Sequence, residues 1–316
     1  MLRFSLHDLL CPHKCYEWLL QALHPNGLKC PNGHLLPADQ APHDRHRLPI
    51  VDYRCRECGA VFNLFTDTFW EKSRLPCDKV VSILQGVAQG KPTLQMADEL
   101  GLDYSWLLKR RHQMQANAQQ ALPRETPLAD PVTEADEMYQ NAGEKGDKHP
   151  DPADPPRRRA NKARGHGTWD NDRPPILGLV GRTTGQIRLT VCHNSQRETL
   201  QPKVEAATRS DATVNTDEWS AYDRLPDTGR RHARVCHTPG KREWARDEDG
   251  DGKREVHCNT MEGIWTGLRN FLRSFRGVHK KYLAQYVAIF EWAHNLKEVT
   301  LAYLRRLMGC FTPEPT

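Results

Sequence analysis

The chain has 316 residues, more than one ordinary domain, so we expect a domain of normal size accompanied by smaller modules. Its formal charge of +5 and pI of about 8.6 permit binding to nucleic acid without establishing it. We expect no secretory signal in residues 1–10, and the metal-type spacing of several cysteines indicates a reducing cytoplasm rather than a disulfide framework.

The N-terminal region has the cysteine spacing of a zinc ribbon. Residues 1–28 contain an apolar series around Trp18 that predicts a short helix. Two knuckles follow, CPNGH and YRCRECG, separated by a polar loop. Four such ligands hold one tetrahedral Zn²⁺, which stabilises a segment too short to form its own core. The predicted structural zinc ligands are Cys30, His34, Cys55 and Cys58.

One of these ligands is open to alternatives. Gly33 stands where the first knuckle would carry its second cysteine, so His34 takes the fourth place. Cys11, His13 and Cys15 are the other candidates for that place. The alternative to a metal site is a set of buried or incidental cysteines.

The next segment predicts a helix-turn-helix. In PTLQMADELGLDYSWLLKRRHQM, apolar residues recur at helical spacing on both sides of Gly101. A second helix after such a turn can enter the DNA major groove, although any small helical hairpin has a similar pattern. The basic residues predicted to contact DNA here are Lys109, Arg110 and Arg111.

The chain beyond residue 122 predicts an α/β domain. We expect a strand through VTEADEMY, a β-hairpin through ILGLVGRTTGQIRLTVCH, a helix near 198–207, a strand ending at Asp217 and a short strand near 233–236. Helices are expected over 259–275 and 281–306. The second helix is amphipathic because charged residues interrupt it, so it is not a membrane span.

Two segments of this domain lack regular patterns. Residues 141–175 are rich in Pro, Gly and charge, and a loop this long is either functional or disordered. Three consecutive arginines of this loop can contact phosphates: Arg157, Arg158 and Arg159. The sequence from Asp247 to Gly252 matches the first half of a Ca²⁺ loop, but Cys258 stands where a Glu is required. We interpret that sequence as a polar turn.

Three carboxylates are candidates for a site that binds divalent cations. They are Asp136 in EADEMY, Asp217 in NTDEWSAY and Glu262 in NTMEGIW. Hard oxygen ligands suit Mg²⁺ or Mn²⁺, and a pair of such ions can stabilise both oxygens of a phosphodiester displacement. The alternatives are polar residues at strand ends, with the neighbouring acids Glu137 and Glu218 competing for the same role. For Glu262 the alternative is a capping box with Asn259 as the N-cap.

Taken together, these motifs give the chain a resemblance to the bacterial insertion-sequence DDE transposases of the ISXO-like group. The resemblance covers most of the chain: the cysteine knuckles, TDTFWEKSRLP, the helix-turn-helix, EADEMY, RPPILGLV, NTDEWSAY and NTMEGIW. It implies an RNase H-like catalytic domain (residues 123–316) preceded by a zinc ribbon (1–72) and a helix-turn-helix region (73–122).

The resemblance implies further that Asp136, Asp217 and Glu262 are catalytic ligands of two Mg²⁺ ions. The expected activity is cleavage of element ends and joining of the 3′-OH to target DNA. The partners would be double-stranded DNA, as terminal inverted repeats and target, and a second copy of the chain or more. Basic residues of the later helices, Arg269, Arg273 and Arg276, would hold the DNA backbone, and the protein would be cytoplasmic and associated with the nucleoid.

Two other functions fit the same motifs. A domesticated regulator would bind DNA through the ribbon and the helix-turn-helix while its acidic residues do nothing. A structure-specific nuclease of the same fold would cut DNA without joining strands. Products of strand transfer distinguish the transposase from both.

Overall fold

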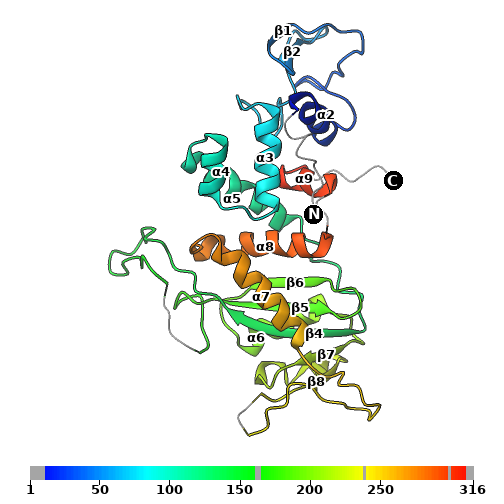
Figure 1. Ribbon diagram of the computed structural model, residues 1–316, viewed down its shortest axis with the longest axis vertical. Coiled ribbons are helices and arrows are strands. Elements are labelled where there is room, and N and C mark those ends of the chain that lie inside the picture. The colour runs from blue at the N-terminus through cyan, green and yellow to red at the C-terminus, as the bar shows by residue number, and fades with distance from the viewer. Residues whose placement is uncertain (1–10, 161–164, 238–239, 298–299, 311–316) are drawn as a thin grey trace. The chain divides into compact units, whose positions relative to one another are not determined.

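The computed structural model describes residues 11–160, 165–237, 240–297 and 300–310 (Figure 1). The chain divides into two compact units. The first comprises the chain up to Ala121 together with the segment from Leu296, and the second is Leu122–Asn295. The C-terminal segment from Leu296 belongs to the first unit. Every helix within the described ranges is too short or too polar to cross a bilayer.

The first unit combines a small three-stranded sheet with a group of helices. The strands are antiparallel in the order β1-β2-β3. In chain order the elements are α2 (Pro12–Leu23), β1 (Asp44–Arg47), β2 (Ile50–Arg54), β3 (Val61–Phe62), α3 (Cys77–Ala88), α4 (Thr93–Leu100), α5 (Tyr104–Gln120) and α9 (Leu301–Leu307).

The expected pair of helices around Gly101 is present as α4 and α5. Gly101 ends α4 in the left-handed conformation (φ +61°), which glycine adopts without steric cost. The Asp103 carboxylate then caps α5 by accepting from the backbone N–H of Trp106 at 2.7 Å. The segment is thus a helical hairpin with a tight turn, and its role in DNA binding stays a prediction.

The predicted long C-terminal helix is wrong, because the structure divides it. Helix α8 (Lys280–Leu296) ends before Lys297, which has a φ of +54° that a continuing α-helix cannot contain. A new helix, α9, starts after Thr300, whose hydroxyl accepts from the N–H of Tyr303 at 3.2 Å. The side chains of Tyr303 and Leu304 are fully buried, which accounts for α9 belonging to the first unit.

The second unit is a five-stranded mixed sheet in the order β6-β5-β4-β7-β8. β4, β5 and β6 pair antiparallel, whereas β4, β7 and β8 pair parallel. The elements are β4 (Val132–Tyr139), β5 (Pro175–Gly181), β6 (Ile187–Val191), α6 (Arg197–Ala207), β7 (Thr213–Thr216), β8 (Arg231–Arg234), α7 (Asn259–Arg273) and α8. The expected α/β class, hairpin and strand at Asp217 are confirmed, and the arrangement fits an RNase H-like domain.

Helices cover both faces of this sheet (Figure 1). α7 and α8 pack on one face around Met138, Val180 and Trp265. α6 and the short 3-10 helix that follows β7 (Ser220–Tyr222) pack on the other face with Leu177 and Val204. All seven residues of β5 are buried, as expected for a strand covered on both sides.

α7 lies close to the backbone of β5 at Gly178. A Cβ atom added there would lie 2.4 Å from Met261 Cε and from Trp265 Cη2, closer than carbon atoms can approach. Gly178 is paired with Asp136 across the β4–β5 ladder. The absence of a side chain at this position therefore sets how closely α7 approaches the centre of the sheet.

Replacing Gly178 by alanine should destabilise the fold by about 1–3 kcal/mol, the usual cost of overpacking a core. Gly263→Ala is the control, since a Cβ there meets nothing within 4 Å and alanine favours helix by roughly 0.5–1 kcal/mol. Denaturant unfolding of the two variants measures both effects. A Gly178→Ala protein as stable as the wild type contradicts the close packing.

Candidate zinc site and candidate active site

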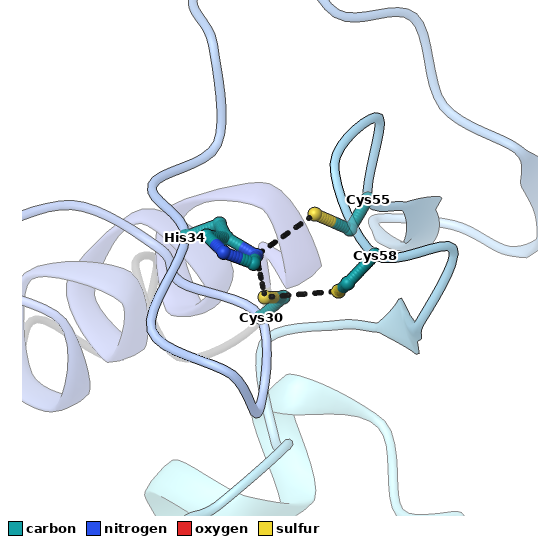
Figure 2. A group of neighbouring side chains, drawn as sticks. All are labelled: Cys30, His34, Cys55 and Cys58. Carbon is teal, nitrogen blue, oxygen red and sulfur yellow. Dashed lines mark hydrogen bonds between the residues drawn. The ribbon is translucent and has the colours of Figure 1, made fainter.

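The four predicted zinc ligands come together in the first unit. Figure 2 shows Cys30, His34, Cys55 and Cys58 pointing toward one centre. Cys30 Sγ lies 3.4 Å from His34 Nδ1 and 3.7 Å from Cys58 Sγ, and Cys55 Sγ lies 3.5 Å from His34 Nδ1. All four ligand atoms are within 4.8 Å of one another, which is the spread of a tetrahedral set. These side chains can bind one zinc ion.

Tight backbone turns bring the ligands into this arrangement. The N–H of Gly33 donates to Cys30 O at 2.8 Å, and the N–H of Gly59 donates to Cys55 O at 3.0 Å. Gly33 and Gly59 have φ values of +85° and +76°, the left-handed region that favours glycine. Gly33 thus forms the turn of the knuckle and leaves the ligand position to His34.

The chemistry of the donors suits zinc. The backbone N–H of Ala60 and the Asn32 side chain lower the pKa of Cys58 to about 6, so its thiolate is accessible at neutral pH. Cys11 and Cys15 are outside the group of four. Because His34 lies inside this group, it stays the predicted fourth ligand.

In the second unit, the sheet places Asp136 and Asp217 side by side. β4 and β7 are parallel neighbours with Glu134 level with Asn215. Two residues further along each strand, Asp136 is therefore level with Asp217, which directly follows the last residue of β7. The charge of Asp217 contributes to raising the pKa of Asp136, as expected for close carboxylates.

The alternation of β4 decides which of its acids joins this pair. The face toward α7 carries Glu134, Asp136 and the core residue Met138. Asp136 Oδ2 accepts from Trp265 Nε1 of α7 at 2.7 Å. Glu137 points to the opposite face, where its Oε2 accepts from the Tyr222 hydroxyl at 2.5 Å.

Glu262 lies in the first turn of α7 and is exposed to solvent. The capping-box alternative is not formed: the N-cap is Cys258, without a side-chain hydrogen bond, and Asn259 is already helical. The charge of Glu262 adds to the shift of the Asp136 pKa. Its side chain thus has no capping role, and its charge acts on the Asp136 carboxylate.

The electrostatics of the site leave negative charge without a matching cation. Burial, followed by the nearby charges, raises the pKa of Asp136 to about 6, and burial raises the pKa of Asp217. Burial also raises the pKa of Glu137 to about 8. Among the described residues, no Lys, Arg or His lies within 4.0 Å of the Asp136 or Asp217 carboxylates. Carboxylates in such an environment favour a divalent cation.

The three candidate carboxylates do not converge on one point. The described groups of three or more ligands whose atoms lie within 4.8 Å of one another are the zinc set and an acidic set, Asp247, Asp249 and Glu255. Asp136, Asp217 and Glu262 form a wider arrangement. In the acidic set, Asp247 accepts from the N–H groups of Gly250 and Gly252, which makes it the polar turn expected from the sequence.

The predicted DNA-binding residues differ in exposure. Lys109 is exposed, Arg110 lies over the rings of Phe69 and Trp106, and Arg111 is fully buried with its guanidinium donating to Lys91 O. A phosphate cannot reach a side chain buried inside the unit, so the expectation for Arg111 is corrected. The three arginines after Glu262, by contrast, are all exposed: Arg269, Arg273 and Arg276.

The Pro-rich loop is folded onto the start of α8 by buried ion pairs. The Lys280 ammonium lies 2.9 Å from Glu144 and 3.1 Å from Asp172, two carboxylates that are at most 5 % exposed. Arg157 also pairs with Asp172 at 2.5 Å, while half of its side chain stays exposed. Arg157, Arg158 and Arg159 are all exposed, and their role in contacting phosphates stays a prediction.

The loop brings His166 to the candidate site, a residue that the sequence analysis missed. Its ring stacks on Trp219 at 4.5 Å, and its Nδ1 is 2.5 Å from the Tyr139 hydroxyl. His166 and His237 both counteract the raised pKa of Asp217. Nothing in the spacing of these histidines separates them from other loop residues, since their neighbours come from distant elements.

Comparison with known proteins gives a consistent result. A family model described as the ISXO2-like transposase domain matches residues 127–295. An uncharacterised protein in the transposable element ISH50 of Halobacterium salinarum is 27 % identical over 244 residues, 76 % of either chain.

Two solved structures resemble the chain only remotely. A simian T-cell lymphotropic virus intasome matches with a TM-score of 0.30 and 11 % identity over 67 % of each chain. A pre-cleavage Mos1 transpososome matches with a TM-score of 0.27 and 8 % identity over 72 % of this chain and 76 % of its own.

Loss of a zinc ligand should remove zinc from the purified protein. We expect one zinc ion per wild-type chain by elemental analysis, and most of it lost in His34→Ala and Cys55→Ser, because three ligands hold the ion more weakly. Cys11→Ser is the matched control and should keep its zinc. Zinc retained by His34→Ala but lost from Cys11→Ser would reverse the ligand assignment.

Proposed function

Because the chain belongs to the ISXO2-like transposase family, we propose that it is a DNA transposase that cuts the ends of an insertion sequence and joins them to target DNA. The observation that carries this proposal is that Asp136 of β4 and Asp217, directly after the neighbouring parallel strand β7, lie level with each other inside the matched domain. With Glu262 they form the acidic set expected of a phosphoryl-transfer site.

The donor set fits two Mg²⁺ or Mn²⁺ ions. Bound there, the ions would stabilise the attacking and leaving oxygens of a phosphodiester displacement. Asp136 and Asp217 supply hard oxygen ligands from the sheet, and Glu262 supplies another from α7. Trp265 and the N–H of Trp219 hold the two aspartates by one hydrogen bond each, which orients the carboxylates while leaving other oxygen lone pairs for ligation.

The fixed position of these carboxylates on the sheet suits phosphoryl transfer. The reaction requires positioning and charge stabilisation more than covalent chemistry by a side chain. Carboxylates at a central sheet meet that requirement, because Asp136 lies on the central strand β4, paired with Gly178 of β5, and Asp217 directly follows the neighbouring strand β7. Cleavage would release a 3′-OH, and the same site would direct that hydroxyl at the target phosphodiester.

Exposed basic residues near Glu262 provide a surface for the DNA backbone. Arg269 lies seven residues after Glu262, so both project from the same face of α7. Arg273 follows one turn later, and Arg276 continues beyond the helix end. Contacts of this kind release counterions, so binding should weaken steeply with salt.

The first unit supplies the recognition part of the proposal. The zinc-binding knuckles and the hairpin of α4 and α5, with Lys109 exposed on α5, would read the terminal inverted repeats. Pairing two element ends requires at least a dimer on DNA. The acidic set argues against a regulator without catalysis, and strand-transfer products would separate a transposase from a nuclease.

Neutralising the sheet carboxylates should abolish chemistry but not binding. We expect Asp217→Asn and Asp136→Asn to lose Mg²⁺-dependent nicking at the repeat boundary, since each removes a charged ligand, and to bind repeat DNA with affinity close to wild type. Labelled duplex carrying the repeats that flank the gene, with Mg²⁺ or EDTA, provides the assay. Full cleavage by either variant contradicts its assignment, and binding without cleavage by the wild type favours the regulator.

Without divalent cations, Asp136→Asn should melt at a higher temperature than the wild type at pH 7.5. The folded-state pKa of Asp136 is raised to about 6 against roughly 3.9 in an unfolded chain, so protonation stabilises the fold below about pH 4. That stability is lost as the pH rises through about 6. Asparagine is uncharged throughout, and its advantage should shrink between pH 7.5 and pH 5.

Melting curves in EDTA at the two pH values test this directly. The Glu262→Gln protein is the control, because its exposed carboxylate is not buried in the fold. An Asp136→Asn protein that melts at a lower temperature than the wild type at pH 7.5 would show that the ionised Asp136 carboxylate does not destabilise the fold.

A further inference from the structure

We propose that Glu134 is a positioning residue, which holds the first turn of α7 on β4 and so fixes the place of Glu262 relative to Asp136. This inference rests on the proposed function, because it gives Glu134 a role in building the acidic site. Glu134 lies two residues before Asp136 on the same face of β4. Its side chain is completely buried.

The Glu134 carboxylate satisfies the beginning of α7. Its Oε2 accepts from the backbone N–H of Met261 at 3.0 Å, and its Oε1 accepts from the Thr260 hydroxyl at 2.8 Å. The first N–H groups of a helix lack partners within the helix, and a carboxylate near them is favourable. α7 has no side-chain cap from its own N-cap, Cys258. Glu134 of β4, which is distant in the sequence, therefore caps the N-terminus of α7.

Arg182 makes the burial of this charge tolerable. Its Nε donates to Glu134 Oε1 at 2.9 Å, which pairs the buried carboxylate with a positive charge. The same guanidinium donates to His257 O at 2.7 Å and to Glu255 O. The pair thus connects β4 to the last residues before α7 as well as to its first turn.

The turn that carries Glu262 is anchored to β4 on both sides. Met261 is attached to Glu134 by its N–H, and Trp265 is attached to Asp136 by its indole N–H at 2.7 Å. Glu262 is exposed and makes no comparable contact among the described residues, so these two anchors determine where its carboxylate stands. Misplacement of a reacting group by about 1 Å can cost a hundredfold in rate.

The chain offers a matched control for this role. Glu291 of α8 is also completely buried and paired with an arginine, because Arg124 donates to its two oxygens at 3.0 and 2.8 Å. It further accepts from the N–H of Leu189 at 2.9 Å. No hydrogen bond or ion pair joins Glu291 to α7 or to the acidic set in the described residues. Glu134→Gln and Glu291→Gln therefore remove equivalent charges at different places.

Two measurements on the full-length proteins test the proposal. The first is hydrogen exchange of the peptide spanning residues 258–265. We expect faster exchange there in Glu134→Gln than in the wild type or Glu291→Gln. The second is titration with Mn²⁺, followed by calorimetry and by the metal concentration that gives half-maximal cleavage. We expect Glu134→Gln to need at least about tenfold more Mn²⁺ than the wild type, which is the usual effect of removing a residue that orients a metal ligand. Glu291→Gln should need the same Mn²⁺ concentration as the wild type.

The outcomes separate this proposal from the proposed function. Unchanged exchange at 258–265 in Glu134→Gln, or an equal loss of Mn²⁺ affinity in both variants, overturns the positioning role, since the effect would then be general destabilisation. If the wild type binds Mn²⁺ but does not cut DNA, the proposed function fails while the exchange and binding comparisons still decide the role of Glu134. If the wild type binds no Mn²⁺, the positioning role toward a metal ligand fails as well.

Discussion

Burying a carboxylate away from water is costly unless its charge is paired, and the second unit contains both paired and unpaired buried carboxylates. At Glu134 and Glu291 an arginine neutralises the buried charge, so both residues can serve the fold. At Asp136 and Asp217 hydrogen bonds from tryptophan N–H groups are provided, but no ion pair exists among the described residues. The raised pKa of Asp136 is the consequence. A divalent cation would relieve that strain, which connects the architecture of the sheet directly to the proposed chemistry.

Much of this arrangement is visible in the sequence because it depends on local patterns. The alternation before Asp217 predicts a strand that delivers an acid to its end, and the hairpin around Gly181–Gly185 follows from two apolar runs. The knuckle spacing likewise predicts the zinc-binding group. Local patterns do not predict contacts between residues that are distant in the sequence. The choice between Asp136 and Glu137 depends on which face of β4 is covered by α7. The capping-box alternative fails because the first turn of α7 is capped by Glu134 of β4.

The corrections have a similar cause. Arg111 belongs to a basic run that predicts a DNA contact, but the packing of the helical unit buries it. The helix expected through residue 306 is interrupted at Lys297, where the chain enters a second helix that packs in the other unit. The loop at 141–175, which the sequence leaves as either functional or disordered, is joined through Asp172 to Lys280 of α8. In each case the deciding interaction joins residues that are remote in the sequence.

The most direct test of the central claim is the position of Mn²⁺ in a crystal of the protein, located by anomalous scattering. The structure predicts a strong peak between the carboxylates of Asp136 and Asp217, with Glu262 turned toward it. Manganese bound only at the exposed acidic turn near Asp247, or an empty sheet edge at saturating Mn²⁺, would contradict the assignment of these carboxylates as the metal-binding centre of the proposed transposase.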